Sequence, residues 1–188
     1  MSELNISRQA ESNSAQTKKL SHTTTIVLTA MFTALVYVFT MIHINPFGLP
    51  GGLVHLGNIP FFVAAILFDK KVGMISGGVG MALFDIFSPY GIWAPFTLVI
   101  GFATAYVISL ATSRHKRFLY YLLAFILAAI VKVVGYYIAE GIIYGNWIAP
   151  IQAVPANLIQ VGVASVIVLL IIEPLRFAAE RTILRGHS

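Results

Sequence analysis

Residues 93–143 read WAPFTLVIGFATAYVISLATSRHKRFLYYLLAFILAAIVKVVGYYIAEGII, and this stretch decides the fold. Two long apolar runs, residues 93–111 and 118–143, stand on either side of the basic cluster Arg114-His115-Lys116-Arg117. A helix needs about 20 apolar residues to cross the hydrocarbon core of a bilayer, so each run is long enough to span it. The stretch therefore predicts two transmembrane helices joined by a short basic loop.

Four further apolar segments continue this pattern on both sides of the pair. Two of them are short for full spans, so we expect one to be tilted or to start within a loop. Only 10% of the 188 residues are charged and 58% are hydrophobic, whereas a soluble domain carries about 25% charged residues. The chain is therefore predicted to be an all-α integral membrane protein of about six transmembrane helices. The four segments are residues 24–42, 56–68, 72–87 and 151–172, the last followed by an amphipathic tail with Arg176, Glu180, Arg181 and Arg185.

The N-terminal 21 residues differ from the rest of the chain. They are polar and contain no apolar run, which argues against a cleaved signal peptide. We expect residues 1–21 to form a disordered cytoplasmic tail and residues 22–188 to form the membrane domain.

The basic residues are concentrated at the two ends of the chain and in alternate connections between the predicted helices. Eleven of the twelve Lys and Arg residues precede the first helix, follow the last, or lie in the second and fourth connections; the other three connections contain none. Basic loops stay in the cytoplasm, so both termini are predicted to be cytoplasmic. The eleven are Arg8, Lys18, Lys19, Lys70, Lys71, Arg114, Lys116, Arg117, Arg176, Arg181 and Arg185.

Three ionisable residues, Asp85, Lys132 and Glu140, fall inside or near the end of predicted spans. Such residues are costly in a bilayer and mark candidate functional sites. At 1.5 Å per residue, Asp85 lies about 21 Å and Lys132 about 22 Å from the cytoplasmic ends of their helices. Their similar depth leaves two readings open: an ion pair that joins the two helices, or a role in ligand binding.

Other polar and aromatic residues gather towards the same outer end. Lys132, Tyr136 and Glu140 share one helix face because they are four residues apart. Amides provide directional hydrogen bonds, and aromatic rings can stack on a heterocycle. The alternatives are an interhelical hydrogen bond for the amides of the last helix, and an interfacial aromatic belt for the tryptophans. The candidate substrate-binding residues are Trp93, Lys132, Tyr136, Glu140, Asn146, Trp147, Asn157, Gln160, His55 and Asp85.

Several function classes find no support. There is no cysteine, which excludes disulfides and thiolate metal sites. His43 and His55 lack a third ligand, so no metal and no cofactor are expected. The chain contains neither a GxxxxGK[ST] nucleotide loop nor an HExxH or Ser/His/Asp arrangement, so it is not expected to be an enzyme. Its basic residues do not alternate with aromatic residues in one patch, which argues against nucleic acid.

Small residues indicate where helices approach closely. Ala30 and Ala34 form a small-xxx-small pattern that serves either internal packing or the docking of a partner subunit. Segment 72–87 carries Gly73, Gly77, Gly78 and Gly80, for which internal packing is the favoured reading. The first outer connection, around residues 45–52, is uncharged and rich in glycine and proline, as expected of a lid.

One further set of motifs lies between residues 52 and 97: Gly52-Leu53-Val54-His55-Leu56-Gly57-Asn58, the glycines at 73, 77, 78 and 80, Asp85, Tyr90-Gly91-Ile92-Trp93-Ala94-Pro95 and Thr97. These motifs resemble the substrate-binding S components of energy-coupling-factor (ECF) vitamin transporters, in particular the riboflavin-type subgroup, which includes proteins for hydroxymethylpyrimidine or pyridoxine. The resemblance extends over all six helices in length and topology, and is most specific between residues 52 and 101. One departure is Asn58, where an aspartate is common in the family.

The resemblance implies a multi-pass protein of a prokaryotic cell membrane that captures a vitamin from outside. It also implies partners: a transmembrane coupling subunit, which docks on an alanine motif matching Ala30 and Ala34, and two cytoplasmic ATPases. Loading would be followed by toppling of the S component within the bilayer. We favour hydroxymethylpyrimidine or pyridoxine as substrate, with riboflavin or pantothenate as alternatives. An alternative of another class is a stand-alone secondary transporter driven by protons.

Overall fold

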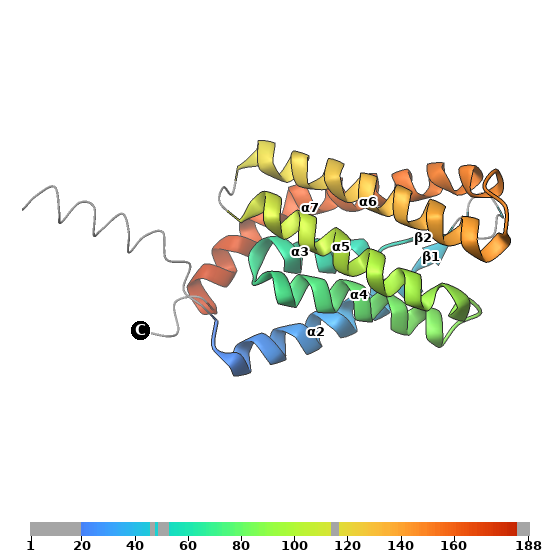
Figure 1. Cartoon of the computed structure of the whole chain (residues 1–188). Coiled ribbons are helices and arrows are strands. Elements are labelled where there is room, and N and C mark those ends of the chain that lie inside the picture. Colours follow the sequence, from blue (N-terminus) through green and yellow to red (C-terminus); the bar gives the residue numbers. More distant parts are fainter. Residues whose placement is uncertain (1–19, 46–47, 49–52, 114–116, 184–188) are drawn as a thin grey trace, which may run out of the picture.

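The computed structural model describes residues 20–45, 48, 53–113 and 117–183. Six α-helices of this part lie side by side in one bundle, as Figure 1 shows. A two-stranded antiparallel hairpin, in which His43 pairs with His55, lies at one end of the bundle. The elements are α2 (His22–Met41), β1 (His43–Ile44), β2 (Val54–His55), α3 (Asn58–Leu67), α4 (Lys70–Ile86), the 3₁₀ turn η1 (Gly91–Trp93), α5 (Ala94–Thr112), α6 (Phe118–Tyr144), the 3₁₀ turn η2 (Ala149–Ala153) and α7 (Val154–Thr182).

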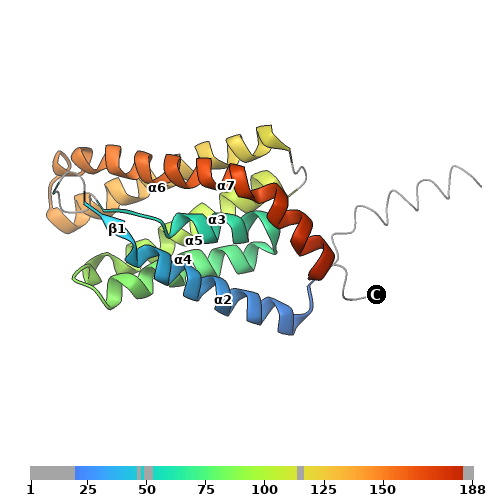
Figure 2. The same ribbon diagram turned by 180° about the vertical axis from the view of Figure 1, so that it is seen from behind.

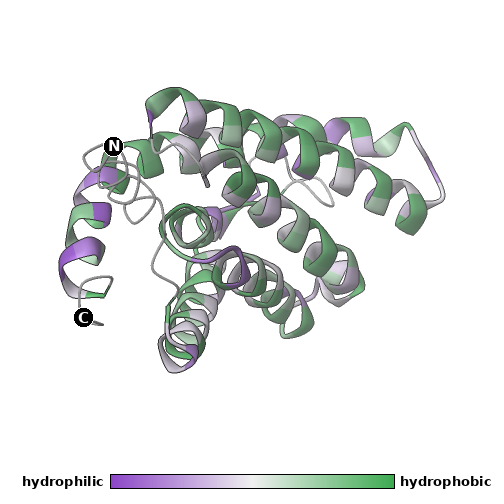
Figure 3. Cartoon of the chain, turned by 60° about the vertical axis from the view of Figure 1, so that its left-hand side comes forward, coloured by the Kyte–Doolittle hydropathy of each residue, from purple (hydrophilic) through white to green (hydrophobic). Residues whose placement is uncertain are grey.

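The bundle confirms an all-helical membrane protein. Four helical stretches are long and apolar enough to cross a bilayer, namely residues 22–41, 91–112, 118–144 and 149–182. Large apolar side chains on their outer faces are exposed, among them Val99 at 65%, Leu119 at 69% and Leu170 at 74%. In Figure 3 hydrophobic residues run along most of each helix, and hydrophilic residues appear at connections and in the C-terminal turns of α7. Exposed apolar faces of this extent are typical of a surface that faces lipid.

The helices alternate in direction along the chain. Consequently α2, α4 and α6 begin, and α3, α5 and α7 end, at the same end of the bundle (Figures 1 and 2). The described basic residues outside the apolar runs, including Lys70, Lys71 and Arg117, lie at this end. By the positive-inside rule it faces the cytoplasm, and the hairpin end faces outward.

Helix α3 is the short segment expected from the sequence. It has ten residues, of which all except Leu67 are buried, and at 1.5 Å per residue it covers only about 15 Å. The chain reaches it from the outer end through the extended strand β2. The second membrane segment therefore starts within a loop, and other helices shield it from lipid. Its rings Phe61 and Phe62 contact each other and Phe125 in the apolar core.

The glycines of α4 serve internal packing, as favoured from the sequence. A Cβ atom at Gly80 would lie 2.7 Å from the Val36 Cβ of α2, and one at Gly73 would lie 2.6 Å from the Ala65 Cα of α3. A Cβ at Gly101 of α5 would lie 2.7 Å from the Gly78 Cα. Because these distances are too short for a side chain, the glycines let four helix backbones approach one another closely.

Helix α7 is longer than expected. The tail predicted after residue 172 continues the same helix through Pro174 to Thr182. Figure 2 shows its C-terminal part turning away from the axis of the first part, towards the start of α2. Proline causes such bends because it lacks the N–H that would bond to the carbonyl four residues earlier.

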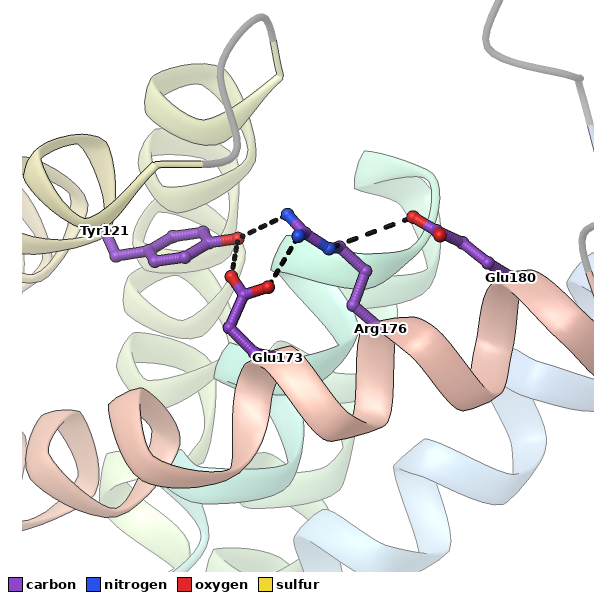
Figure 4. Close-up of polar contacts among 4 residues, drawn as sticks. All are labelled: Tyr121, Glu173, Arg176 and Glu180. Atoms are coloured by element: carbon purple, nitrogen blue, oxygen red, sulfur yellow. Dashed lines mark hydrogen bonds and ion pairs between the residues drawn. The ribbon is translucent and has the colours of Figure 1, made fainter.

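A polar cluster beside this bend ties α7 to α6 (Figure 4). Arg176 forms an ion pair with Glu173 and a longer one, 3.8 Å, with Glu180. Its Nη1 also donates to the hydroxyl of Tyr121 at 3.4 Å, and that hydroxyl donates to Glu173 Oε1 at 3.3 Å. Tyr121 is buried in α6, so the cluster fixes the bent part of α7 against the bundle.

Two sequence expectations fall on residues outside the described part of the chain: the disordered tail, except for Leu20 and Ser21, and most of the lid around residues 45–52.

Candidate functional site

A cavity opens at the outer end of the bundle, where α2, α4 and α6 end and α5 and α7 begin. The space between its walls that no atom occupies, which includes open solvent at the mouth, is about 500 Å³. Seven of the ten residues predicted to bind substrate line it: His55, Asp85, Trp93, Tyr136, Glu140, Asn157 and Gln160. The other lining residues are Thr40, Leu53, Met81, Phe84, Tyr90 and Thr97.

Helix geometry brings the polar side chains together from distant parts of the sequence. Tyr136 and Glu140 are one turn apart near the end of α6, and Asn157 and Gln160 are one turn apart at the start of α7. Asp85 is in the last turn of α4. The interior of the cytoplasmic half is mainly apolar, apart from hydroxyl groups such as those of Ser109 and Thr112, whereas the buried ionisable and amide side chains lie in the outer half.

One wall of the cavity is aromatic. The rings of Phe84 and Tyr90 are stacked with centroids 6.2 Å apart, and Trp93 meets Tyr90 edge-on at 5.9 Å. On its other side Trp93 meets Tyr144 at 6.1 Å. Such a wall offers flat apolar surface to a planar ligand, which gives Trp93 a position at the cavity rather than only in an interfacial belt.

His55 links the hairpin to α7. Its Nδ1 lies 3.1 Å from the backbone N–H of Gly57 and accepts that hydrogen, so the proton of the neutral ring is on Nε2. Nε2 lies 2.7 Å from the side-chain amide of Gln160, and a protonated Nε2 requires the amide oxygen on that side. Burial, the charge of Lys132 and His43 lower the pKa of His55 well below its usual value of 6.5.

Three buried polar atoms of the lining residues have no hydrogen-bond partner in the described part of the chain: Asp85 Oδ2, Glu140 Oε1 and Trp93 Nε1. Glu140 is only 1% exposed and Asp85 8%. An unpartnered buried polar group costs about 1–3 kcal/mol, so such atoms at a cavity wall indicate where a ligand would supply partners.

Thr97, near the start of α5, links Tyr136 of α6 to Asp85 of α4. Its hydroxyl accepts from the Tyr136 hydroxyl at 3.4 Å and is in hydrogen-bonding contact with the Asp85 carboxylate. Tyr136 and Asp85 are therefore both held by the same residue near the start of α5.

Lys132 lies behind the cavity wall and does not line it. It is fully buried, donates to Asn58 Oδ1 at 2.8 Å, and lies 5.4 Å from the ring centre of Tyr136. Neither of the ion pairs found among the described residues joins it to Asp85. The residue that the lysine contacts is thus Asn58 on α3, the position at which this chain departs from the aspartate that is common in the family it resembles.

Asn146 and Trp147 also lie away from the cavity, in the turn after α6. Asn146 Oδ1 accepts the backbone N–H of Ile148 at 2.8 Å. The Trp147 ring covers Gly141, where a Cβ would approach it to 2.4 Å, and the Trp147 carbonyl accepts from the Tyr137 hydroxyl at 2.7 Å. These contacts shape the turn between α6 and α7.

Thr40, Thr97 and Tyr90 are lining residues that the sequence prediction of the site left out. All three lie at the outer end of a predicted span, and the two threonines are polar residues within apolar segments. The depth argument applied to Asp85 could have found them. For Met81, Phe84 and Leu53, apolar residues in an apolar chain, the sequence contains no comparable signal.

Two further expectations concern surfaces. Ala30 and Ala34 are exposed on α2, so the small-residue face is not used for packing within the described bundle. No group of three or more potential metal-ligating side chains occurs within the described ranges.

Comparisons with known proteins agree with this architecture. The family model for the S component of ECF-type riboflavin transporters matches residues 20–176. The thiamine precursor transporter HmpT of Lactococcus lactis subsp. cremoris is 31% identical over 143 residues, which are 76% of this chain and 81% of that protein. An uncharacterised protein of Pyrococcus woesei is 36% identical over 113 residues, 58% of this chain and 74% of that protein.

A solved structure of the S component of a bacterial ECF transporter has the same fold. It superposes with a TM-score of 0.67 at 20% identity, covering 86% of this chain and 100% of the other. The chain therefore belongs to the S-component family of ECF-type riboflavin transporters: it is a multi-pass prokaryotic membrane protein and the substrate-binding subunit of an ECF importer, which works with an energizing module and is not itself an enzyme.

Proposed function

We propose that this chain is the high-affinity binding subunit for hydroxymethylpyrimidine, a water-soluble thiamine precursor. The observation that carries the proposal is the set of unpartnered buried atoms in the cavity, two carboxylate oxygens and one indole N–H. An aminopyrimidine with a hydroxymethyl group presents N–H and O–H donors to the carboxylates and a ring nitrogen to the indole. The named relative HmpT, 31% identical, supports the same substrate.

The aromatic wall fits a flat heterocycle. A single pyrimidine ring can lie against Trp93 and Tyr90 while its edge meets Glu140 or Asp85, because all four residues line one cavity. Gln160 and Asn157 add amide groups to the same lining. In this arrangement stacking contributes affinity, and the polar edge determines the orientation.

Pyridoxine, riboflavin and pantothenate are the alternative substrates within the family. Pyridoxine is also a single ring with hydroxymethyl groups, but it lacks the exocyclic amine that would donate to the lining carboxylates. Pantothenate carries a carboxylate, which the carboxylates of Asp85 and Glu140 would repel. Riboflavin has three fused rings and is the substrate in the name of the matching family. All three belong in the same binding panel.

The coupling subunit and the two ATPases of the importer are proposed as partners. We propose that the coupling subunit docks on the exposed face of α2 at Ala30 and Ala34, where small residues allow another helix to approach closely. Substrate would be captured from outside through the outer end, and ATP hydrolysis in the partners would drive its release to the cytoplasm. The family makes a stand-alone proton-driven carrier the weaker reading.

Tryptophan fluorescence tests the substrate, because the chain has only two tryptophans. Trp93 lines the cavity and Trp147 does not. Titration of the purified protein with hydroxymethylpyrimidine should change the emission of the wild type and of Trp147→Phe, but not of Trp93→Phe. Calorimetric titration should give submicromolar binding. Mass spectrometry of small molecules that co-purify provides an independent check.

Failure to bind hydroxymethylpyrimidine below micromolar concentrations, with tight binding of another member of the panel, would assign the site to that compound. An unchanged emission of Trp147→Phe during calorimetrically detected binding would move the site away from Trp93.

A further inference from the structure

The charges around the cavity are of one sign. Asp85 and Glu140 line it, and no lysine or arginine is among its described lining residues. Lys132 is the nearest buried cation, but it donates to Asn58 behind the wall. We propose that Asp85 and Glu140 make this cavity selective for the free alcohol form of the heterocycle and exclude its phosphate ester. The inference rests on the proposed function and states which form of the substrate the same site accepts.

His55 does not alter this balance. It is the one imidazole of the lining, and burial lowers its pKa well below the usual range. Its Nδ1 already accepts the Gly57 N–H, so the ring is neutral near pH 7 and has no second N–H to offer. A phosphate would meet no charged donor there.

Helix N-termini could bind an anion in principle, because their first N–H groups are free and their dipoles are favourable. Both α5 and α7 begin at the outer end, but each follows a 3₁₀ turn that uses the first donor. The Ala94 N–H is bonded to the Gly91 carbonyl, and the Val154 N–H to the Ile151 carbonyl. Pro95 and Pro155 then remove the next N–H of each helix. The available backbone donors are thus reduced at both helix starts.

The unpartnered atoms point to the same selectivity. Asp85 Oδ2 and Glu140 Oε1 are acceptors when ionised, and the donors of an amine or a hydroxyl satisfy them. A phosphate monoester carries about −1.5 to −2 charges and only acceptor oxygens at neutral pH. It would place like charges together in a site of low dielectric, where they repel more strongly than in water.

The test compares three ligands on the purified full-length chain: hydroxymethylpyrimidine, its phosphate ester, and its uncharged acetyl ester, which controls for size. We expect wild type to bind the phosphate ester at least about 100-fold more weakly than the free alcohol, and more weakly than the acetyl ester. Glu140→Gln and Asp85→Asn should each reduce the ratio of the two Kd values by about tenfold. Glu180→Gln, at the cytoplasmic end, should keep the wild-type ratio.

The outcomes separate the two proposals. Equal binding of the alcohol and the phosphate ester by wild type would overturn the charge selectivity and leave the proposed function standing. The same holds if neither carboxylate variant changes the ratio, or if the acetyl ester is rejected as strongly as the phosphate ester. If hydroxymethylpyrimidine itself does not bind, both proposals fail. Thermal unfolding of each variant shows that it is folded, and one folded carboxylate variant is enough for the comparison.

Discussion

At the scale of single residues, the contact between Lys132 and Asn58 is the least expected feature of the bundle. A fully buried ammonium group donates to a neutral amide oxygen at 2.8 Å, although a carboxylate would compensate its charge better. We expect Asn58→Asp to raise the free energy of unfolding by about 1–2 kcal/mol, because hydrogen bonds to charged partners are the stronger ones. Thermal unfolding in detergent measures it.

The matched control for this change is the double variant with Lys132→Met. Without the ammonium group, the aspartate at position 58 should become destabilising, since a lone buried carboxylate has no partner. A gain in stability that persists in the double variant would show that the lysine is not its cause.

Gly57 is a second critical position, because it lies between two residues of the cavity wall. A Cβ there would come within 2.1 Å of Thr40 Oγ1 and 3.0 Å of His55 Nδ1. Gly57→Ala should therefore displace both side chains and weaken substrate binding by about tenfold or more, roughly the effect of losing one good hydrogen bond. Calorimetric titration measures the change.

Gly162→Ala is the control for Gly57→Ala. Gly162 is exposed in α7, and a Cβ there meets nothing within 4 Å. This change should leave affinity unaltered and stabilise the helix by up to about 1 kcal/mol. Equal affinity of both alanine variants would contradict the role assigned to Gly57.

His55 predicts a dependence of stability on pH. Its pKa is lowered in the folded state by burial, Lys132 and His43, from the usual 6.5. Because the unfolded chain binds this proton more readily, stability falls as pH decreases below about 6.5, by at most about 1.4 kcal/mol per pH unit. Protonation would also end the acceptance of the Gly57 N–H by Nδ1. Unfolding temperatures between pH 7.5 and 5.5 measure the slope, which should be shallower in His55→Gln; equal slopes would assign the effect to other groups.

At the scale of elements, α2 has two faces with separate tasks. Leu28, Phe32 and Val36 are buried against the bundle, whereas Ala30 and Ala34 are exposed. Ala34→Leu should leave substrate binding intact and abolish ATP-driven uptake in cells or vesicles that contain the whole importer, because the bulky side chain keeps the coupling subunit at a distance. Val166→Leu, at an exposed position of α7, should transport normally. Wild-type uptake by Ala34→Leu would remove the docking proposal.

Helices that consist of long apolar runs could be predicted from the sequence, whereas the polar end of α7 could not. Long apolar runs such as residues 118–143 identify their helices readily, because a helix satisfies all of its backbone hydrogen bonds within one segment and about 20 apolar residues are enough to span the bilayer. The sequence predicts only an amphipathic tail beyond residue 172, because the apolar run ends there. The structure continues α7 through Pro174 to Thr182, and contacts of Arg176 and Glu173 with Tyr121 join this part to α6.

At the scale of the whole molecule, the charge distribution sets the orientation, and the absence of cysteine makes it testable. A single cysteine at Ile148, 75% exposed at the outer end, should react with a membrane-impermeant maleimide on intact cells. A cysteine at Arg117 should react only after lysis. The reverse pattern would invert the topology and with it the direction of capture.

Part of the candidate site could be predicted from the sequence, namely several of the polar residues that line the cavity. Polar residues are costly against lipid and therefore tend to face the interior, so Asp85, Tyr136, Glu140, Asn157 and Gln160, all in the outer halves of their helices, can be grouped from the sequence alone. A shared helix face does not show how deep a cavity reaches, however. Lys132 is on the same face as Tyr136 and Glu140 but lies two turns further from the outer end than Glu140, and the structure places it against α3.

The brevity of α3 also bears on how the protein is made. A ten-residue segment enclosed by α2, α4, α5 and α7 is too short to leave the translocon as an independent span. Its surroundings are complete only when α7, which follows the other described helices along the chain, has been added. Biogenesis must therefore keep this segment sheltered until α7 is made, and the part of the molecule that carries His55 and Asn58 matures late.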